Sequence, residues 1–71
     1  MIARIYDKDK VSLSPYIEFS DDKTLQQLLE WFYDFYRGAL EQITYIGIID
    51  TQRKVYSLYD LHFNLIENEQ L

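Results

Sequence analysis

Three carboxylates near the N-terminus have the spacing of calcium ligands. Asp7, Asp9 and Glu18 occupy positions 1, 3 and 12 of a twelve-residue window, as the ligands of an EF-hand loop do. The window places Val11 at position 5, and Ser12 at position 6, where the loop needs glycine. The alternation of apolar residues in this segment favours a hairpin instead of a loop between helices. We therefore interpret these carboxylates as a charged hairpin turn and expect no metal site.

Two further groups of titratable residues could carry acid–base chemistry. Glu30 and Asp34 lie one helical turn apart, but they fall on a polar stripe where Arg37 follows Asp34 at i+3. His62 is the only histidine, whereas a catalytic triad needs a serine and an acid beside it, and a zinc site needs three or four ligands. The chain has no cysteine. If the strand alternation continues, His62 shares a face with Tyr56, which favours a structural or interface role. We expect a protein that is not an enzyme and binds no cofactor.

The densest aromatic cluster has helical spacing. Phe32, Phe35 and Tyr36 fall on the apolar stripe and are interpreted as core. Trp31 and Tyr33 fall on its flanks, where each either covers the margin of the core or anchors a partner, as Trp and Tyr often do.

The elements that position these side chains follow from changes in periodicity. Residues 1–6 are apolar and β-branched, residues 7–10 form a charged turn, and residues 11–19 alternate with period two. This pattern predicts two strands joined as a hairpin. Because Pro15 cannot donate to a ladder, the second strand should lie at an edge or carry a bulge near Ser14.

A helix follows, for which Ser20 or Asp21 is the expected cap. The apolar positions with i, i+3, i+4 spacing are Leu25, Leu28, Leu29, Phe32, Phe35 and Tyr36. Gly38 is the expected residue after the helix end.

The second half of the chain predicts two more strands. Residues 43–49 are apolar on both faces, as in a central strand, and residues 50–53 form a turn. Residues 54–66 form an extended run that is long for a strand, so we expect a bulge near Asp60, with a short helix capped by Asp60 as the alternative. Residues 66–71 are interpreted as a frayed polar tail.

The predicted architecture is a single α+β domain over residues 1–71 with the order ββαββ. One amphipathic helix would pack on one face of a four-stranded antiparallel sheet. A domain this small buries only about 60% of the surface of its unfolded chain. A dense aromatic core or self-association is the expected compensation.

Charge and hydropathy limit the partners. The 71 residues carry a net charge of −5, which disfavours direct binding to nucleic acid or to an anionic membrane surface. Residues 43–50 also lack the basic residue and the glycine–aromatic order of an RNA-recognition module. No apolar stretch approaches the roughly 20 residues that span a bilayer, and no export signal is evident, so a cytoplasmic protein is expected.

The feature that indicates a function is that the predicted strands carry more apolar residues than one helix can cover. One helix can cover one face of the sheet, yet the strands are apolar on both faces, and the face away from the helix would carry Tyr16, Tyr56 and Leu58. Such an exposed patch marks an interaction surface, unless the C-terminal segment folds back over it. We therefore predict a small protein-binding module, most simply a homodimer formed through this face or through an edge strand. The predicted partner-binding residues are Tyr16, Trp31, Tyr33, Tyr56, Leu58 and His62.

An alternative is an acidic inhibitor that imitates nucleic acid and binds a basic groove of a DNA-binding protein. Its surface would be formed by Asp21, Asp22, Glu30 and Asp34. The complementary potential would steer it to such a partner.

Overall fold

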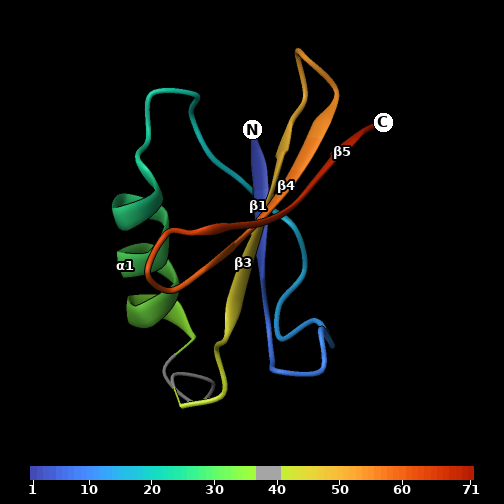
Figure 1. Ribbon diagram of the computed structural model, residues 1–71. Coiled ribbons are helices and arrows are strands. Elements are labelled where there is room, and N and C mark those ends of the chain that lie inside the picture. The colour runs from blue at the N-terminus through green and yellow to red at the C-terminus, as the bar shows by residue number, and fades with distance from the viewer. Residues whose placement is uncertain (37–40) are drawn as a thin grey trace.

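The computed structural model describes residues 1–36 and 41–71 as one antiparallel sheet with one helix (Figure 1). The elements are β1 (Ile2–Tyr6), β2 (Ile17–Glu18), α1 (Leu25–Phe35), β3 (Tyr45–Asp50), β4 (Val55–Asp60) and β5 (Leu65–Gln70). The strand order is β2-β1-β3-β4-β5, and every neighbouring pair is antiparallel. The predicted α+β architecture is confirmed, with a fifth strand added. The predicted helix end at Gly38, and Arg37 as the neighbour of Asp34, lie outside the described residues.

The second strand of the first hairpin is much shorter than the alternation over residues 11–19 predicted. Only Ile17–Glu18 forms β2, because Pro15 interrupts the ladder. The N–H of Leu13 donates to the carbonyl of Ile5 at 2.8 Å, whereas the N–H of Ile5 donates to the side-chain Oγ of Ser14 at 3.2 Å. The serine hydroxyl thus replaces a backbone carbonyl next to the proline. The predicted edge position of this strand is confirmed.

The helix begins later than expected, because Thr24 forms its cap. The Thr24 hydroxyl accepts the N–H of Gln27 at 3.2 Å, and the Gln27 side chain accepts the N–H of Thr24 at 2.9 Å. This reciprocal pair is a capping box, which satisfies two backbone donors at once. The prediction that Ser20 or Asp21 caps the helix is therefore wrong.

The C-terminal run is two strands joined by a turn at Asp60. The Oδ1 atom of Asp60 accepts the N–H groups of His62 and Asn64, each at 2.9 Å, and Phe63 has a positive φ of 65°. A carboxylate that satisfies the donors of a turn favours a reversal of the chain. The predictions of one long strand or of a short helix are both wrong here. Residues 65–70 form β5, so the expected frayed tail is an ordered strand, with a register shift opposite Leu58 and Tyr59.

The hydrophobic core lies between α1 and the sheet. Its buried members are Ala3, Ile5, Leu28, Leu29, Phe32, Ile43 and Ile46. Phe32 is fully buried and packs edge-on against Phe19 and Trp31, with centroid distances of 5.8 and 5.3 Å. The described part of the chain has no helix whose length and apolarity would allow it to span a membrane.

The turn carboxylates predict how stability depends on pH. The backbone N–H of Asn64 lowers the pKa of Asp60, and that of Arg53 lowers the pKa of Asp50. A lowered pKa in the folded state stabilises the protein above the unfolded value of about 3.9, and the stabilisation is lost as the pH falls through the folded value. We expect the urea midpoint to fall below about pH 4, and Asp60→Asn to reduce that fall. An unchanged pH dependence in Asp60→Asn would show that the turn contributes nothing to it.

Candidate functional site

The face of the sheet opposite α1 is packed by the chain itself. Residues that face each other in register lie on the same face, and one such row crosses the sheet through Arg4, Gly47, Leu58 and Glu67. Leu58 is only 2% exposed. It therefore belongs to the packing of this face and is not the accessible contact residue that the sequence suggested.

A tyrosine cluster covers the glycine in this row. The rings of Tyr6 and Tyr56 lie over Gly47, and the hydroxyl groups of Tyr6 and Tyr16 are 3.4 Å apart. The guanidinium carbon of Arg4 lies 3.7 Å from the centroid of the Tyr16 ring, which is cation–π geometry. Burial raises the pKa of the hydroxyl group in each of these tyrosines, so they stay neutral at physiological pH. Tyr16 and Tyr56 thus share one face, as predicted, but their rings are half-buried there.

The connection between β1 and β2, residues 7–16, contributes to the cover of this face. Figure 1 shows this connection on the side of the sheet away from α1. Besides Tyr16, it supplies Lys10, whose ammonium group forms an ion pair with Glu67 of β5. The sequence had suggested the C-terminal segment as the cover.

The helical aromatic residues lie at the margin of the core. Trp31 packs edge-on against Phe19 at 5.2 Å and stacks on Phe35 at 4.5 Å. Trp31 and Tyr33 are both half-buried against the core. Phe35, which was predicted as core, is 66% exposed. The Trp31 ring therefore covers the core margin and places Phe35 on the outside.

His62 and the acidic residues are spread over other parts of the surface. His62 is exposed in the turn after β4, so the expectation that it shares a strand face with Tyr56 is wrong. The carboxylates of Asp22 and Glu30 accept hydrogen bonds from neighbouring side chains, those of Ser20 and Gln26. Asp21 and Asp34 are also exposed, with Asp21 before the helix and Asp34 within its last turn.

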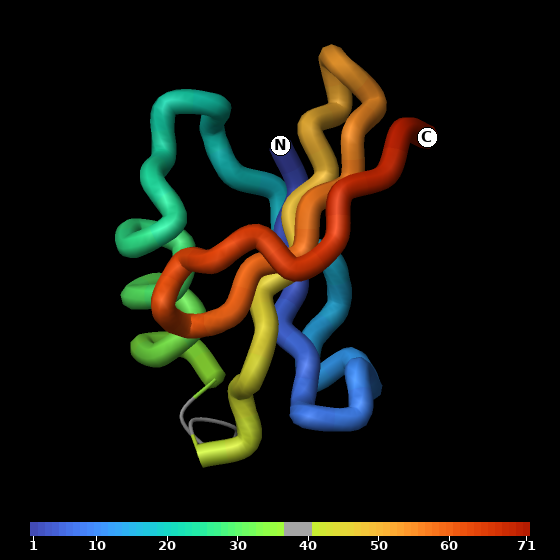
Figure 2. The backbone as a smooth tube through the Cα atoms, in the orientation of Figure 1, coloured from blue at the N-terminus to red at the C-terminus, as the bar shows by residue number. Residues whose placement is uncertain are grey.

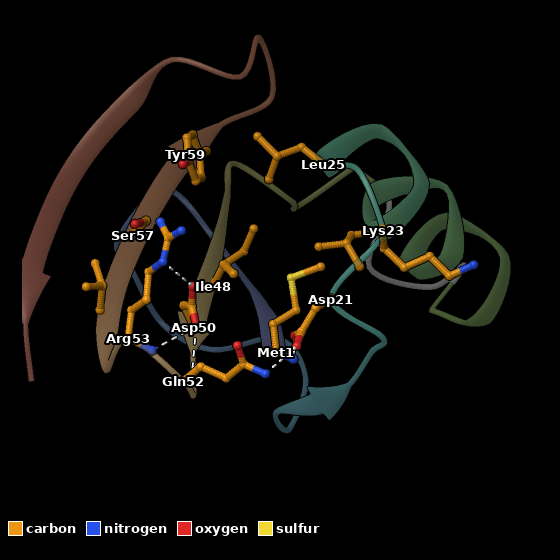
Figure 3. Close-up of a pocket in the computed structure, with 12 residues that line it drawn as sticks. Met1, Asp21, Lys23, Leu25, Ile48, Asp50, Gln52, Arg53, Ser57 and Tyr59 are labelled. Atoms are coloured by element: carbon orange, nitrogen blue, oxygen red, sulfur yellow. Dashed lines mark hydrogen bonds and ion pairs between the residues drawn. The ribbon is translucent and has the colours of Figure 1, made fainter.

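A hollow of about 530 Å³ lies between the start of α1 and the β3–β4 hairpin (Figure 3). It is lined by Met1, Asp21, Lys23, Leu25, Leu28, Ile48, Asp50, Gln52, Arg53, Val55, Ser57 and Tyr59. Asp50 accepts the N–H groups of Gln52 and Arg53, each at 3.0 Å, and Asp21 accepts the amino group of Met1 at 2.6 Å. Both carboxylates are thus engaged in structural contacts. The lining offers no nucleophile with a base beside it, and no three ligating side chains gather within residues 1–36 and 41–71 to hold a metal.

Among residues 1–36 and 41–71, no segment pairs with the outer edge of the last strand of the sheet. All six residues of β5 are exposed, and the strand pairs with β4 on one side (Figure 2). The N–H of Leu71 donates to the carbonyl of Lys54 at 2.7 Å. Because backbone groups alternate along an antiparallel strand, those of Asn68 and Gln70 point away from β4. Leu65 and Ile66 at its start are 51% and 45% exposed.

Comparisons of the chain with protein-family models, with curated proteins and with solved structures found no match. The assignment of a function therefore depends on the surfaces described above. Of these, the edge of β5 is the surface that sequence reasoning missed. Strand propensity is low at Glu67, Asn68 and Glu69. The polar composition of this segment therefore favoured a frayed tail over a strand. The Asp60-to-Asn64 turn was the available signal, because it ends one strand and leaves the next residues free to pair.

Proposed function

We propose that the protein is a small protein-interaction module in which β5 receives an extended strand of another chain. The observation that carries this proposal is the edge of β5, which is six residues long and exposed throughout. An edge strand presents unpaired N–H and C=O groups that template a further strand. Strand addition of this kind is a common mode of peptide recognition, in which main-chain hydrogen bonds supply affinity.

The two faces of the sheet and its opposite edge also favour this choice, because other parts of the chain pack against the faces and the opposite edge is protected. On one face of the sheet α1 packs against β1 and β3 and leaves the hollow beside β4, and on the other face lie the tyrosine cluster and residues 7–16. At the opposite edge, β2 has two residues and Pro15 precedes it, which is a typical protection against strand addition. The open edge of β5 has no such proline.

The predicted homodimer is one form of this module. A second copy of the chain would then pair through the same edge strand. Sedimentation at increasing protein concentration tests this form directly. A dimer whose β5 amides become protected from hydrogen exchange supports it, and a monomer at all concentrations excludes it.

Proline at position 68 should remove binding and keep the fold. The N–H of Asn68 points away from β4, so Asn68→Pro deletes a donor needed by an added strand without deleting a bond to β4. Short peptides selected from a displayed random library would serve as probes. We expect at least about tenfold weaker binding of these peptides to Asn68→Pro, a loss of about 1.4 kcal/mol.

Glu69→Pro is the matched control for the fold. It removes a bond to β4 and should lower the thermal midpoint, whereas Asn68→Pro should change it little. Selected peptides that bind wild-type protein and folded Asn68→Pro equally well would place the binding surface elsewhere and contradict the proposal.

A further inference from the structure

We propose that the strand received by β5 is basic, with Lys or Arg at alternate positions opposite Glu67 and Glu69. This inference rests on the proposed function, because it names the chemistry of the partner of the same edge. Glu67 pairs with Leu58 and Glu69 with Tyr56, so both carboxylates stand on the face of the sheet opposite α1. An added strand would place its own alternate side chains beside them.

The same two carboxylates oppose pairing with a second copy in the two registers centred on Glu67 and Asn68. In a symmetric antiparallel pair that continues the sheet, facing residues lie on the same face. A pair centred on Asn68 places Glu67 of each copy opposite Glu69 of the other, and a pair centred on Glu67 places Glu67 opposite itself. Like charges directly opposite each other destabilise a strand pair. Charged residues on an edge are a common device against pairing of identical strands.

A strand with Lys or Arg opposite Glu67 and Glu69 would replace this repulsion between carboxylates with attraction. Lys10 already forms an ion pair with Glu67, which shows that an ammonium group can approach this face of β5. The side chains of both members of that pair are about half exposed, at 48% and 47%. Glu69 carries a second carboxylate two residues away, exposed and outside the ion pairs of the described residues. The net charge of −5 would further speed the approach of a basic segment.

The start of β5 adds an apolar requirement. Leu65 and Ile66 are exposed immediately before Glu67. An antiparallel partner runs in the opposite direction, so the residues after its two basic positions face Leu65 and Ile66. The partner pattern is therefore basic, any residue, basic, followed by apolar residues.

Capped synthetic peptides can test this pattern against purified protein by calorimetry. The probe is Thr-Lys-Thr-Lys-Ile-Val-Thr, and its matched controls carry Thr or Glu in place of both Lys residues. A fourth peptide has the Lys sequence with N-methyl groups on alternate amides, placed at those that would donate to β5. We expect the Lys peptide to bind at least about tenfold more tightly than the Thr peptide at low salt, with a smaller ratio at high salt. N-methylation should abolish binding.

Charge reversal on the protein gives the reciprocal test. Glu69→Lys should lower the affinity for the Lys peptide and raise the affinity for the Glu peptide. Glu30→Lys makes the same change of charge on α1 and should leave the preference between the two peptides unchanged.

The outcomes separate this inference from the proposed function. Equal affinities for the Lys and Thr peptides, together with loss of Lys-peptide binding on N-methylation, would overturn the basic partner and keep β5 as a binding edge. Binding of none of the peptides, or binding that N-methylation leaves intact, would overturn both. A wild-type dimer with protected β5 amides would also overturn the basic partner, because pairing of identical strands would then prevail.

Discussion

Replacement of Leu58 by alanine is expected to lower the free energy of unfolding by about 2–5 kcal/mol, the range for buried leucines. The side chain is 2% exposed on the face of the sheet opposite the helix. If this face were an open docking surface, truncating the residue would cost little in the isolated protein. Because residues 7–16 and the tyrosine cluster cover this face, we expect truncation to leave a cavity.

Leu65→Ala provides the matched control for this experiment. It makes the same chemical change on the same sheet, at a side chain that is 51% exposed. We expect a cost below about 1 kcal/mol there, since surface substitutions usually change stability by about 0.5 kcal/mol or less. Urea unfolding of both variants measures the difference. Equal, small costs would contradict the packing described for this face.

Gly47→Ala is expected to destabilise the protein by about 1–3 kcal/mol, the range for overpacking. A Cβ atom at Gly47 would lie 2.7 Å from Cε2 of Tyr6 and 3.2 Å from Cε2 of Tyr56. Tyr6 is buried, so its ring has little room to move away. The sign is informative, because a strand glycine with open space above it would gain about 0.5–1 kcal/mol from the same change.

A double-mutant cycle with Tyr6→Ala assigns this cost. Without the Tyr6 ring, the new methyl group loses its closest contact, so Gly47→Ala should cost less in the Tyr6→Ala background than in the wild type. Denaturant midpoints of the four proteins give the coupling energy. An undiminished cost in that background would show that Tyr6 is not the obstacle.

The candidate surface was predicted only in part. Tyr16 and Tyr56 were placed on one face from alternation alone, and the structure confirms that placement. Alternation cannot say what else packs there, so the burial of Leu58 and the stacking of Arg4 on Tyr16 were not foreseen. The edge of β5 was missed because its central residues are polar, and a polar sequence pairs as a strand only when a neighbouring strand offers its backbone.

Local signals in the sequence determined the elements with strong periodicity. The i, i+3, i+4 spacing around Phe32 predicted α1, and Pro15 within the alternating segment predicted a strand at the edge of the sheet. These signals are local because they depend on side chains a few residues apart.

Tertiary structure alone decided the strand count, the cover of the second face and the open edge. Lys10 and Glu67, which are 57 residues apart, are brought together only by the folded chain. The role of β5 depends on backbone hydrogen bonds to β4. Every residue except proline can form such bonds, whatever its side chain. The sequence specifies the side chains, whereas the fold decides which backbone groups stay unpaired. The open edge of β5 could therefore be identified only from the structure.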